Sequence, residues 1–139
     1  MNEQLNEATL RQVIEEGFSK GNYAALDALF TPNYIEHQPG LHTTLEGFKG
    51  DIQALRTGFP DFTLTIDDIV SKDDMVWARA TGRGTHLGPF MGPPTGKSIT
   101  VTVFDVCRFE NGKICEQWGV PDRFTMLMQL GKLPKPQGV

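Results

Sequence analysis

Apolar side chains recur at helical spacing in the first part of the chain. Residues 5–19 predict an amphipathic helix, whose apolar side consists of Leu10, Val13, Ile14 and Phe18. A short second helix is expected over 24–30, and a third follows Thr44, a favoured capping residue, and ends near Gly58. Between these two helices, residues 34–37 are expected to be extended.

After Pro60 the apolar period shortens from about 3.6 to 2 residues, the pattern of half-buried strands. The expected strands are 62–67, 75–85, 99–109 and 114–120. A last helix over 124–130 precedes a tail, 132–139, that we expect to be an arm or disordered. Helices followed by strands, with no repeat and no linker, predict a single α+β domain over residues 1–139.

The dipeptide Asn111-Gly112 is the strongest turn signal of the chain and predicts a two-residue hairpin loop. An unbroken ladder from this loop gives the pairs Phe109–Ile114, Arg108–Cys115, Cys107–Glu116 and Asp105–Trp118. It places the carboxylates Asp105 and Glu116 beside Trp118 on the more apolar face. Burial of an unpaired carboxylate is costly, so these side chains predict either a lined pocket or ion pairs with an arginine such as Arg79 or Arg83.

Three further polar positions are candidates for chemistry. His37 and His86 lie at the ends of expected strands beside Pro or Gly, where a site can open, although a loop histidine with a backbone partner is the commoner arrangement. His42 is expected to be exposed, and no convincing ligand set for zinc accompanies these histidines. Asp122 separates the last strand from the last helix, where it is either a helix cap or a functional carboxylate.

The composition argues against some classes of binding partner. The chain has 139 residues, a net charge of −4 and no cluster of basic residues, so neither nucleic acid nor an anionic membrane is the expected partner. The first residues lack the basic and apolar regions of a signal peptide, which leads us to expect a cytoplasmic protein. Its two cysteines, Cys107 and Cys115, are expected to be reduced and buried.

An ordered set of motifs resembles the SnoaL-like polyketide cyclases. The motifs are FPD (59–61), GRGTHLG (82–88), PPTGK (93–97), RFENGKICEQW (108–118), PD (121–122) and QLG (129–131). The resemblance implies the nuclear transport factor 2-like fold, in which a curved antiparallel sheet wraps into a cone around helices and encloses a ligand cavity. That fold agrees with the predicted order of helices and strands.

The resemblance also implies an activity. Cyclases of this family close a ring by intramolecular aldol condensation without a metal or organic cofactor, and an aspartate after the last strand is the acid/base. Its match is Asp122, whose pKa an apolar cavity would raise. The expected ligand is a polyketide-like or other carbonyl compound, and the remaining candidate binding residues are His37, His86, Asp105, Glu116 and Trp118.

Other functions fit the same features. A non-catalytic protein would use the cavity only to bind a small molecule, and a dehydratase or isomerase of this fold would pair His37 or His86 with Asp105 or Asp122. The family likeness further suggests a homodimer formed through the outer face of the sheet.

Overall fold

The computed structural model describes residues 2–134 of the chain. The helical elements are α1 (Asn2–Val13), a π-helical turn (Ile14–Ser19), a 3-10 turn (Tyr23–Ala28), α2 (Leu45–Gly58) and α3 (Arg123–Gln129). Thr44 caps α2 as expected, because its hydroxyl accepts a hydrogen bond from the backbone N–H of Gly47 at 3.2 Å. The predicted arm lies largely in 135–139, outside the described residues.

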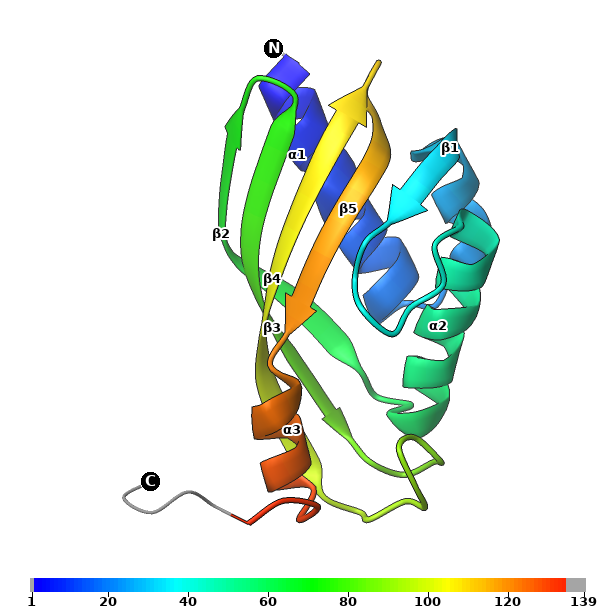
Figure 1. Cartoon of the computed structure of the whole chain (residues 1–139), viewed down its shortest axis with the longest axis vertical. Coiled ribbons are helices and arrows are strands. Elements are labelled where there is room, and N and C mark those ends of the chain that lie inside the picture. Colours follow the sequence, from blue (N-terminus) through cyan, green and yellow to red (C-terminus); the bar gives the residue numbers. More distant parts are fainter. Residues whose placement is uncertain (1, 135–139) are drawn as a thin grey trace.

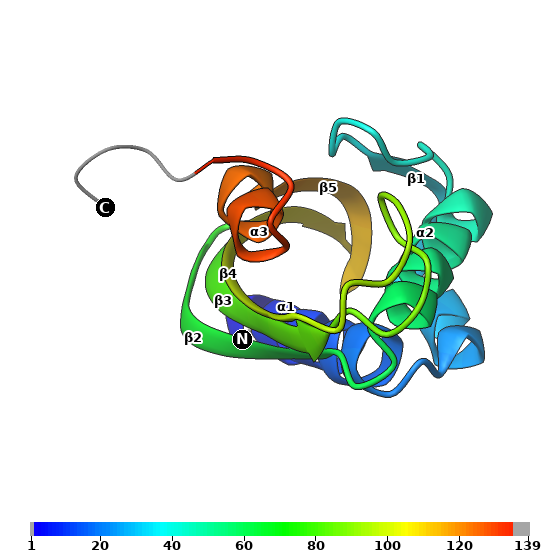
Figure 2. The same cartoon turned by 90° about the horizontal axis from the view of Figure 1, so that it is seen from below.

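One five-stranded sheet curves around the helices (Figures 1 and 2). Its strands are β1 (Phe30–Glu36), β2 (Thr63–Lys72), β3 (Met75–Thr85), β4 (Ser98–Glu110) and β5 (Lys113–Pro121). Their order is β1-β5-β4-β3-β2, with β1 parallel to β5 and every other pair antiparallel. The expected α+β fold with a cone-shaped sheet is confirmed.

The core fills the concave side of this sheet, where α1 and α2 pack (Figure 2). The inward side chains of β4 alternate with exposed ones, as its period of two predicts, and include Ile99, Val101, Cys107 and Phe109. Both cysteines are buried and free, as expected. No helix within residues 2–134 has the length and apolar character needed to cross a membrane.

Tertiary pairing overrides one local prediction near residue 30. The helix expected over 24–30 ends at Ala28, and Phe30 already begins β1. Phe30 pairs with Ile114 of β5, so a strand at the edge of the sheet replaces the last helical residues. The short extended segment expected at 34–37 is the end of this strand.

A β-bulge changes the hairpin between β4 and β5. The turn is as predicted, with positive φ at both Asn111 (51°) and Gly112 (78°), and Phe109 pairs with Ile114. The register then shifts by one residue, and the observed pairs are Arg108–Glu116, Cys107–Gln117, Val106–Trp118 and Asp105–Gly119. The three predicted pairs beyond Phe109 are therefore wrong, because Cys115 is the extra residue of a bulge.

This shift exchanges the two faces of β5. Glu116 and Trp118 lie with Arg108 and Val106 on the outer face, and Gln117 takes the inward position beside Asp105. The side chains predicted to share one pocket thus lie on opposite sides of the sheet.

Candidate active site

A buried carboxyl group marks the concave face of β4. Asp105 is only 4% exposed, and its Oδ1 accepts a hydrogen bond from Nε2 of Gln117 at 2.7 Å. Gln117 reaches Asp105 because of the bulge, which turns its side chain inward. The expected burial of Asp105 on the apolar face is confirmed, although its neighbour is an amide instead of Glu116.

A second carboxyl group lies beside the first. Glu36 is 2% exposed and pairs with Gln117 across the β1–β5 ladder. Its Oε2 accepts the backbone N–H groups of His37 at 3.0 Å and Gln38 at 3.3 Å, whereas Oε1 has no partner within the described residues. The hydroxyl of Tyr34 donates to Oε1 of Gln117 at 3.4 Å. We call Tyr34, Glu36, Asp105 and Gln117 the polar cluster.

Burial controls the protonation of both acids. Desolvation raises the pKa of Asp105 from 3.8 to about 6, and the hydrogen bond from Gln117 lowers it in part. Desolvation also raises the pKa of Glu36, from 4.5 to about 7, with a further contribution from the charge of Asp105. Asp105 therefore ionises first as pH rises, and Glu36 keeps its proton until near neutrality.

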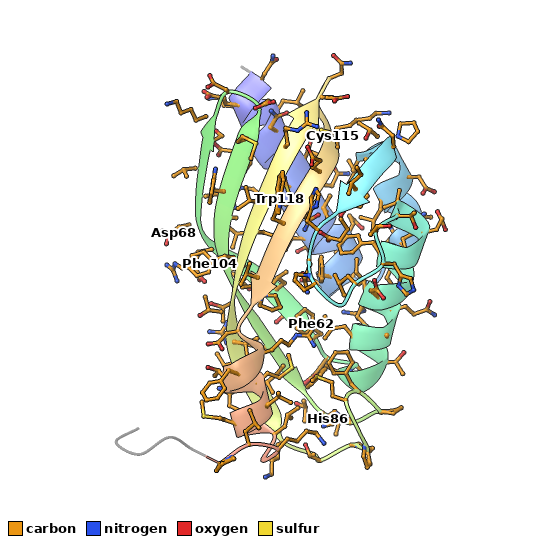
Figure 3. All side chains as sticks on the ribbon, viewed as in Figure 1. Phe62, Asp68, His86, Phe104, Cys115 and Trp118 are labelled. Carbon is orange, nitrogen blue, oxygen red and sulfur yellow. The ribbon has the colours of Figure 1, made fainter. Side chains whose placement is uncertain are left out.

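Asp105 and Gln117 line a cavity on the concave side. This inner pocket has a volume of about 60 Å³, and its wall is otherwise mostly apolar, from Phe18, Leu55, Phe62, Leu64, Val101, Val103 and Met126. Phe62 is seen between the sheet and α2 in Figure 3. Gln38 and Arg123 line both the inner pocket and an outer pocket of about 210 Å³, so the two are adjacent. An apolar wall with a few convergent polar groups is typical of small-molecule sites, but the inner pocket by itself has room for only a small part of a ligand.

Gly119 lets a polar side chain approach this cavity. A Cβ atom at position 119 would lie 2.3 Å from Oε1 of Gln38 and 3.4 Å from Oδ1 of Asp105. Any larger residue would displace Gln38, so the absence of a side chain keeps Gln38 close to Asp105.

Asp122 is placed differently from the expectation. It is exposed, and its carboxylate accepts hydrogen bonds from the backbone N–H (3.0 Å) and the hydroxyl (2.6 Å) of Thr125. Asp122 thereby caps the N-terminus of α3. These bonds lower its pKa, so the expected rise is wrong. The helix-capping alternative describes the observed contacts, and a catalytic role for Asp122 stays a prediction.

Removal of this cap is expected to destabilise the protein. Asp122→Ala leaves the N–H of Thr125 without its partner and should lower the free energy of unfolding by about 1 kcal/mol. Asp122→Asn is the matched control, because asparagine caps a helix about as well as aspartate. Urea unfolding of the three proteins measures the difference, and an unchanged value for Asp122→Ala would contradict the capping role.

His37, Glu116 and Trp118 form a group outside the cavity. The Nε2 atom of His37 lies 2.8 Å from Oε2 of Glu116, and its ring stacks on Trp118 with centroids 4.7 Å apart. Arg108 donates from Nε to Oε1 of Glu116 at 2.7 Å. Hydrogen bonds from His37 and Arg108 lower the pKa of Glu116. The ion-pair alternative for Glu116 is thus realised with Arg108, since Arg79 pairs with Asp67 and Asp68.

The rings of His86 and His42 bond to residues outside the polar cluster. His86 is fully buried just after the end of β3 (Figure 3). Its Nδ1 lies 3.1 Å from Oγ1 of Thr95, and its ring stacks on Phe59. His42 is exposed, as expected, and bonds to Asp51. Within residues 2–134, neither His37 nor His86 pairs with Asp105 or Asp122, and no cluster of three metal-ligating side chains occurs.

Four residues of the site were not predicted from the sequence. Tyr34 and Glu36 are two positions apart in an extended segment, so a strict period of two would have placed them on one face. Gln117 required knowledge of the bulge. Arg123 gave no local signal, because it is the first residue of α3, where only tertiary packing decides whether a side chain faces the cavity.

Known families and structures resemble this chain over most of its length. The family model described as SnoaL-like polyketide cyclase matches residues 8–130. IdmH of Streptomyces antibioticus, a candidate polyketide cyclase, is 36% identical with a TM-score of 0.82, over 91% of this chain and 98% of that one. TsrD of Streptomyces laurentii is 27% identical with a TM-score of 0.85, over 94% and 97% of the two chains.

A third structure carries a different description. AclR of Streptomyces galilaeus, a candidate hydroxylase, is 25% identical with a TM-score of 0.85, over 95% of this chain and 89% of that one. No curated protein matches the sequence. Similar folds in this group thus carry descriptions of more than one reaction.

Proposed function

Because the chain belongs to the SnoaL-like polyketide cyclase family, we propose that it is an enzyme that closes a ring in a carbonyl-activated small molecule. The reaction is an intramolecular aldol condensation that needs acid/base catalysis and no cofactor. One observation carries the proposal: Asp105, a buried carboxyl group with a pKa of about 6, lines an otherwise mostly apolar cavity.

The chemistry requires one group that takes and returns a proton. The Asp105 carboxylate removes a proton from a carbon flanked by carbonyls, and the electron pair of the C–H bond forms an enolate. The enolate carbon attacks a second carbonyl of the same molecule, which forms the new C–C bond and an alkoxide. The alkoxide takes the proton from Asp105, so the carboxylate is regenerated and no atom is lost.

Asp105 is better suited to this step than Asp122. A general base works best when its pKa is near the working pH, and the pKa of Asp105 lies within about one unit of neutrality. Hydrogen bonds from Thr125 make Asp122 a weaker base. Asp122 remains the second candidate, and variants of the two residues separate them.

The other members of the polar cluster serve Asp105. Gln117 holds the carboxylate through its amide, and Tyr34 in turn bonds the carbonyl oxygen of that amide. Glu36, which keeps its proton until near neutrality, places little negative charge beside Asp105 below that pH. These residues position the base and tune its pKa.

The apolar wall is the second contribution to rate. A flexible ligand confined with its reacting carbons in contact gains an effective molarity that is worth roughly 7–11 kcal/mol of barrier. Side chains such as Phe62, Val101 and Val103 supply that confinement.

Deuterium exchange tests the proposal against its alternatives. The protein is incubated in D₂O with a panel of polyketide-like β-keto esters, and ¹H NMR follows the signals of the acidic carbon and of any cyclic product. A cyclase accelerates exchange and ring closure, and Asp105→Asn strongly slows both. Binding without exchange supports a binding protein and overturns the proposal, whereas loss of one water without ring closure identifies a dehydratase.

We further propose a homodimer formed through the outer face of the sheet. Four large apolar side chains are more than half exposed there: Val70 (63%), Trp77 (55%), Phe104 (52%) and Val120 (64%). Phe104 projects away from the helices in Figure 3, beside Asp68. Together with neighbouring residues they line a shallow concavity of about 560 Å³.

Light scattering checks the oligomeric state. The wild type is expected to show twice the mass of one chain, and the double variant Trp77→Lys/Phe104→Asp is expected to show the mass of a monomer, because charges would be buried without partners. Leu87→Lys is the control, since Leu87 is 58% exposed but lies in the loop after β3. A monomeric wild type would refute the proposal.

A further inference from the structure

Arg123 occupies the junction of the cavities. It is the first residue of α3 and lines the inner pocket, the outer pocket and a third pocket of about 330 Å³. Gln38 is the other side chain common to all three. These two polar groups therefore lie where the three pockets adjoin.

The guanidinium of Arg123 has no anionic partner in the described part of the chain. No acidic side chain among residues 2–134 lies within 4.0 Å of it, and its Nε is buried without a hydrogen bond. Its contacts are the ring of Phe90, 5.4 Å from the guanidinium carbon, and the sulfur of Met91, which accepts weakly at 3.5 Å. Burial lowers the pKa of Arg123.

Three other arginines have hydrogen-bond acceptors for their guanidinium groups. Arg79 and Arg108 hold carboxylates, and Arg56 donates to backbone carbonyl groups, including those of Phe18 and Phe62. Arg123 differs from these three arginines, each of which has an oxygen acceptor within the fold.

A purely structural role accounts poorly for a cation at this position. The first turn of a helix favours anions, so α3 does not stabilise Arg123. Packing of the guanidinium on the ring of Phe90 offsets part of the desolvation cost of Arg123. The buried Nε–H of Arg123 still lacks an acceptor, which is unfavourable. Nearby acids are committed elsewhere, because Asp51, which also lines the outer pocket, bonds to His42, and Asp122 bonds to Thr125.

We propose that Arg123, aided by Gln38, binds a carboxylate of the ligand, so that the substrate class is an organic acid. The inference rests on the proposed function, because it assumes that the reacting carbonyl lies at Asp105. A guanidinium matches a carboxylate with two parallel hydrogen bonds. The negative charge of Asp105 repels a second carboxylate, so the acid end of the ligand stays at Arg123 and the carbonyl end enters the inner pocket.

Calorimetry with a matched pair of probes tests the site. The probes are 2-naphthoate and its neutral amide, 2-naphthamide, which differ in charge at nearly equal size. Wild type is expected to bind naphthoate at least about tenfold more tightly than naphthamide, and Arg123→Gln to lose about 10- to 100-fold of the naphthoate affinity. Arg11→Gln, which removes a positive charge from the exposed face of α1, should leave the affinity unchanged.

Thermal unfolding gives a readout that does not need a ligand. Arg123→Met keeps the apolar stem and removes the unpaired cation, so its Tm should rise by about 2–4 °C. An arginine with a structural role would instead give a lower Tm. Arg123→Lys should keep part of the naphthoate affinity, since it keeps the charge without the planar fork.

Three results would overturn the inference: no binding of naphthoate, equal binding of both probes, or an affinity that Arg123→Gln leaves unchanged. These results concern binding alone, so they are independent of turnover. A protein that needs Arg123 to bind naphthoate but catalyses no deuterium exchange keeps the carboxylate site and refutes the cyclase proposal. Exchange that requires Asp105, without preference for naphthoate, supports the cyclase proposal and refutes the carboxylate site.

Discussion

Asp105→Asn is expected to slow ring closure by about 10²–10⁴-fold, the usual contribution of a general acid/base. Asparagine has nearly the same shape, and its carbonyl oxygen still accepts the hydrogen bond from Gln117, so the cavity is retained. The amide cannot take a proton from carbon, and only the catalytic step is lost. Turnover and deuterium exchange of the wild type and the variant measure the effect.

Asp122→Asn is the matched control for this experiment. It makes the same chemical change at an exposed helix cap and is expected to keep the rate of the wild type within a few-fold. If Asp122→Asn loses the activity and Asp105→Asn keeps it, the assignment of the base is reversed. The rate should also rise with pH through about 6, as Asp105 ionises.

The second large effect is a loss of stability as pH rises from about 4 to about 7. The folded-state pKa values of Asp105 and Glu36 are raised to about 6 and about 7, so the folded protein binds more protons than the unfolded chain in this range. Stability therefore falls as pH rises, by up to about 3 kcal/mol for each group. Urea unfolding at a series of pH values measures the slope.

Variants assign this slope to the two acids. Asp105→Asn and Glu36→Gln should each flatten part of the profile and be more stable than the wild type near pH 8, since each variant removes one of the two buried charges. Glu116→Gln is the control, because hydrogen bonds from His37 and Arg108 lower the pKa of Glu116. Ionisation of Glu116 therefore stabilises the folded protein as pH rises, and Glu116→Gln should not flatten the fall. A wild-type profile that is flat between pH 5 and 8 would contradict the raised pKa values.

Both effects arise from the same feature of the fold. A sheet that buries Asp105 and Glu36 together loses stability at neutral pH, and the same burial makes Asp105 a usable base. Asp105→Asn is expected to lower the rate and to raise the stability near pH 8. A variant that gains stability and loses activity indicates that the residue serves function and not folding.

Local sequence signals predicted most of the elements. The 3.6-residue period identified α1 and α2, and the period of two identified β3 and β4 almost to their ends. Asn111 and Gly112 specified the turn, because few residues adopt positive φ in succession. Motifs identified the family and through it the cone-shaped sheet.

The composition of the site was decided by tertiary structure. One bulge residue, Cys115, exchanges Glu116 for Gln117 on the inner face, because a strand has a period of two and a shift of one residue reverses every side chain beyond it. The parallel pairing of β1 brings Glu36 to Asp105, and the packing of α3 against the cavity leaves Arg123 without an acidic partner among residues 2–134. The sequence by itself determined the elements, the turn and the family, since these depend on neighbours in the chain. Which carboxyl groups are buried, and beside which partners, depends on contacts between segments far apart in the chain, which only the folded structure defines.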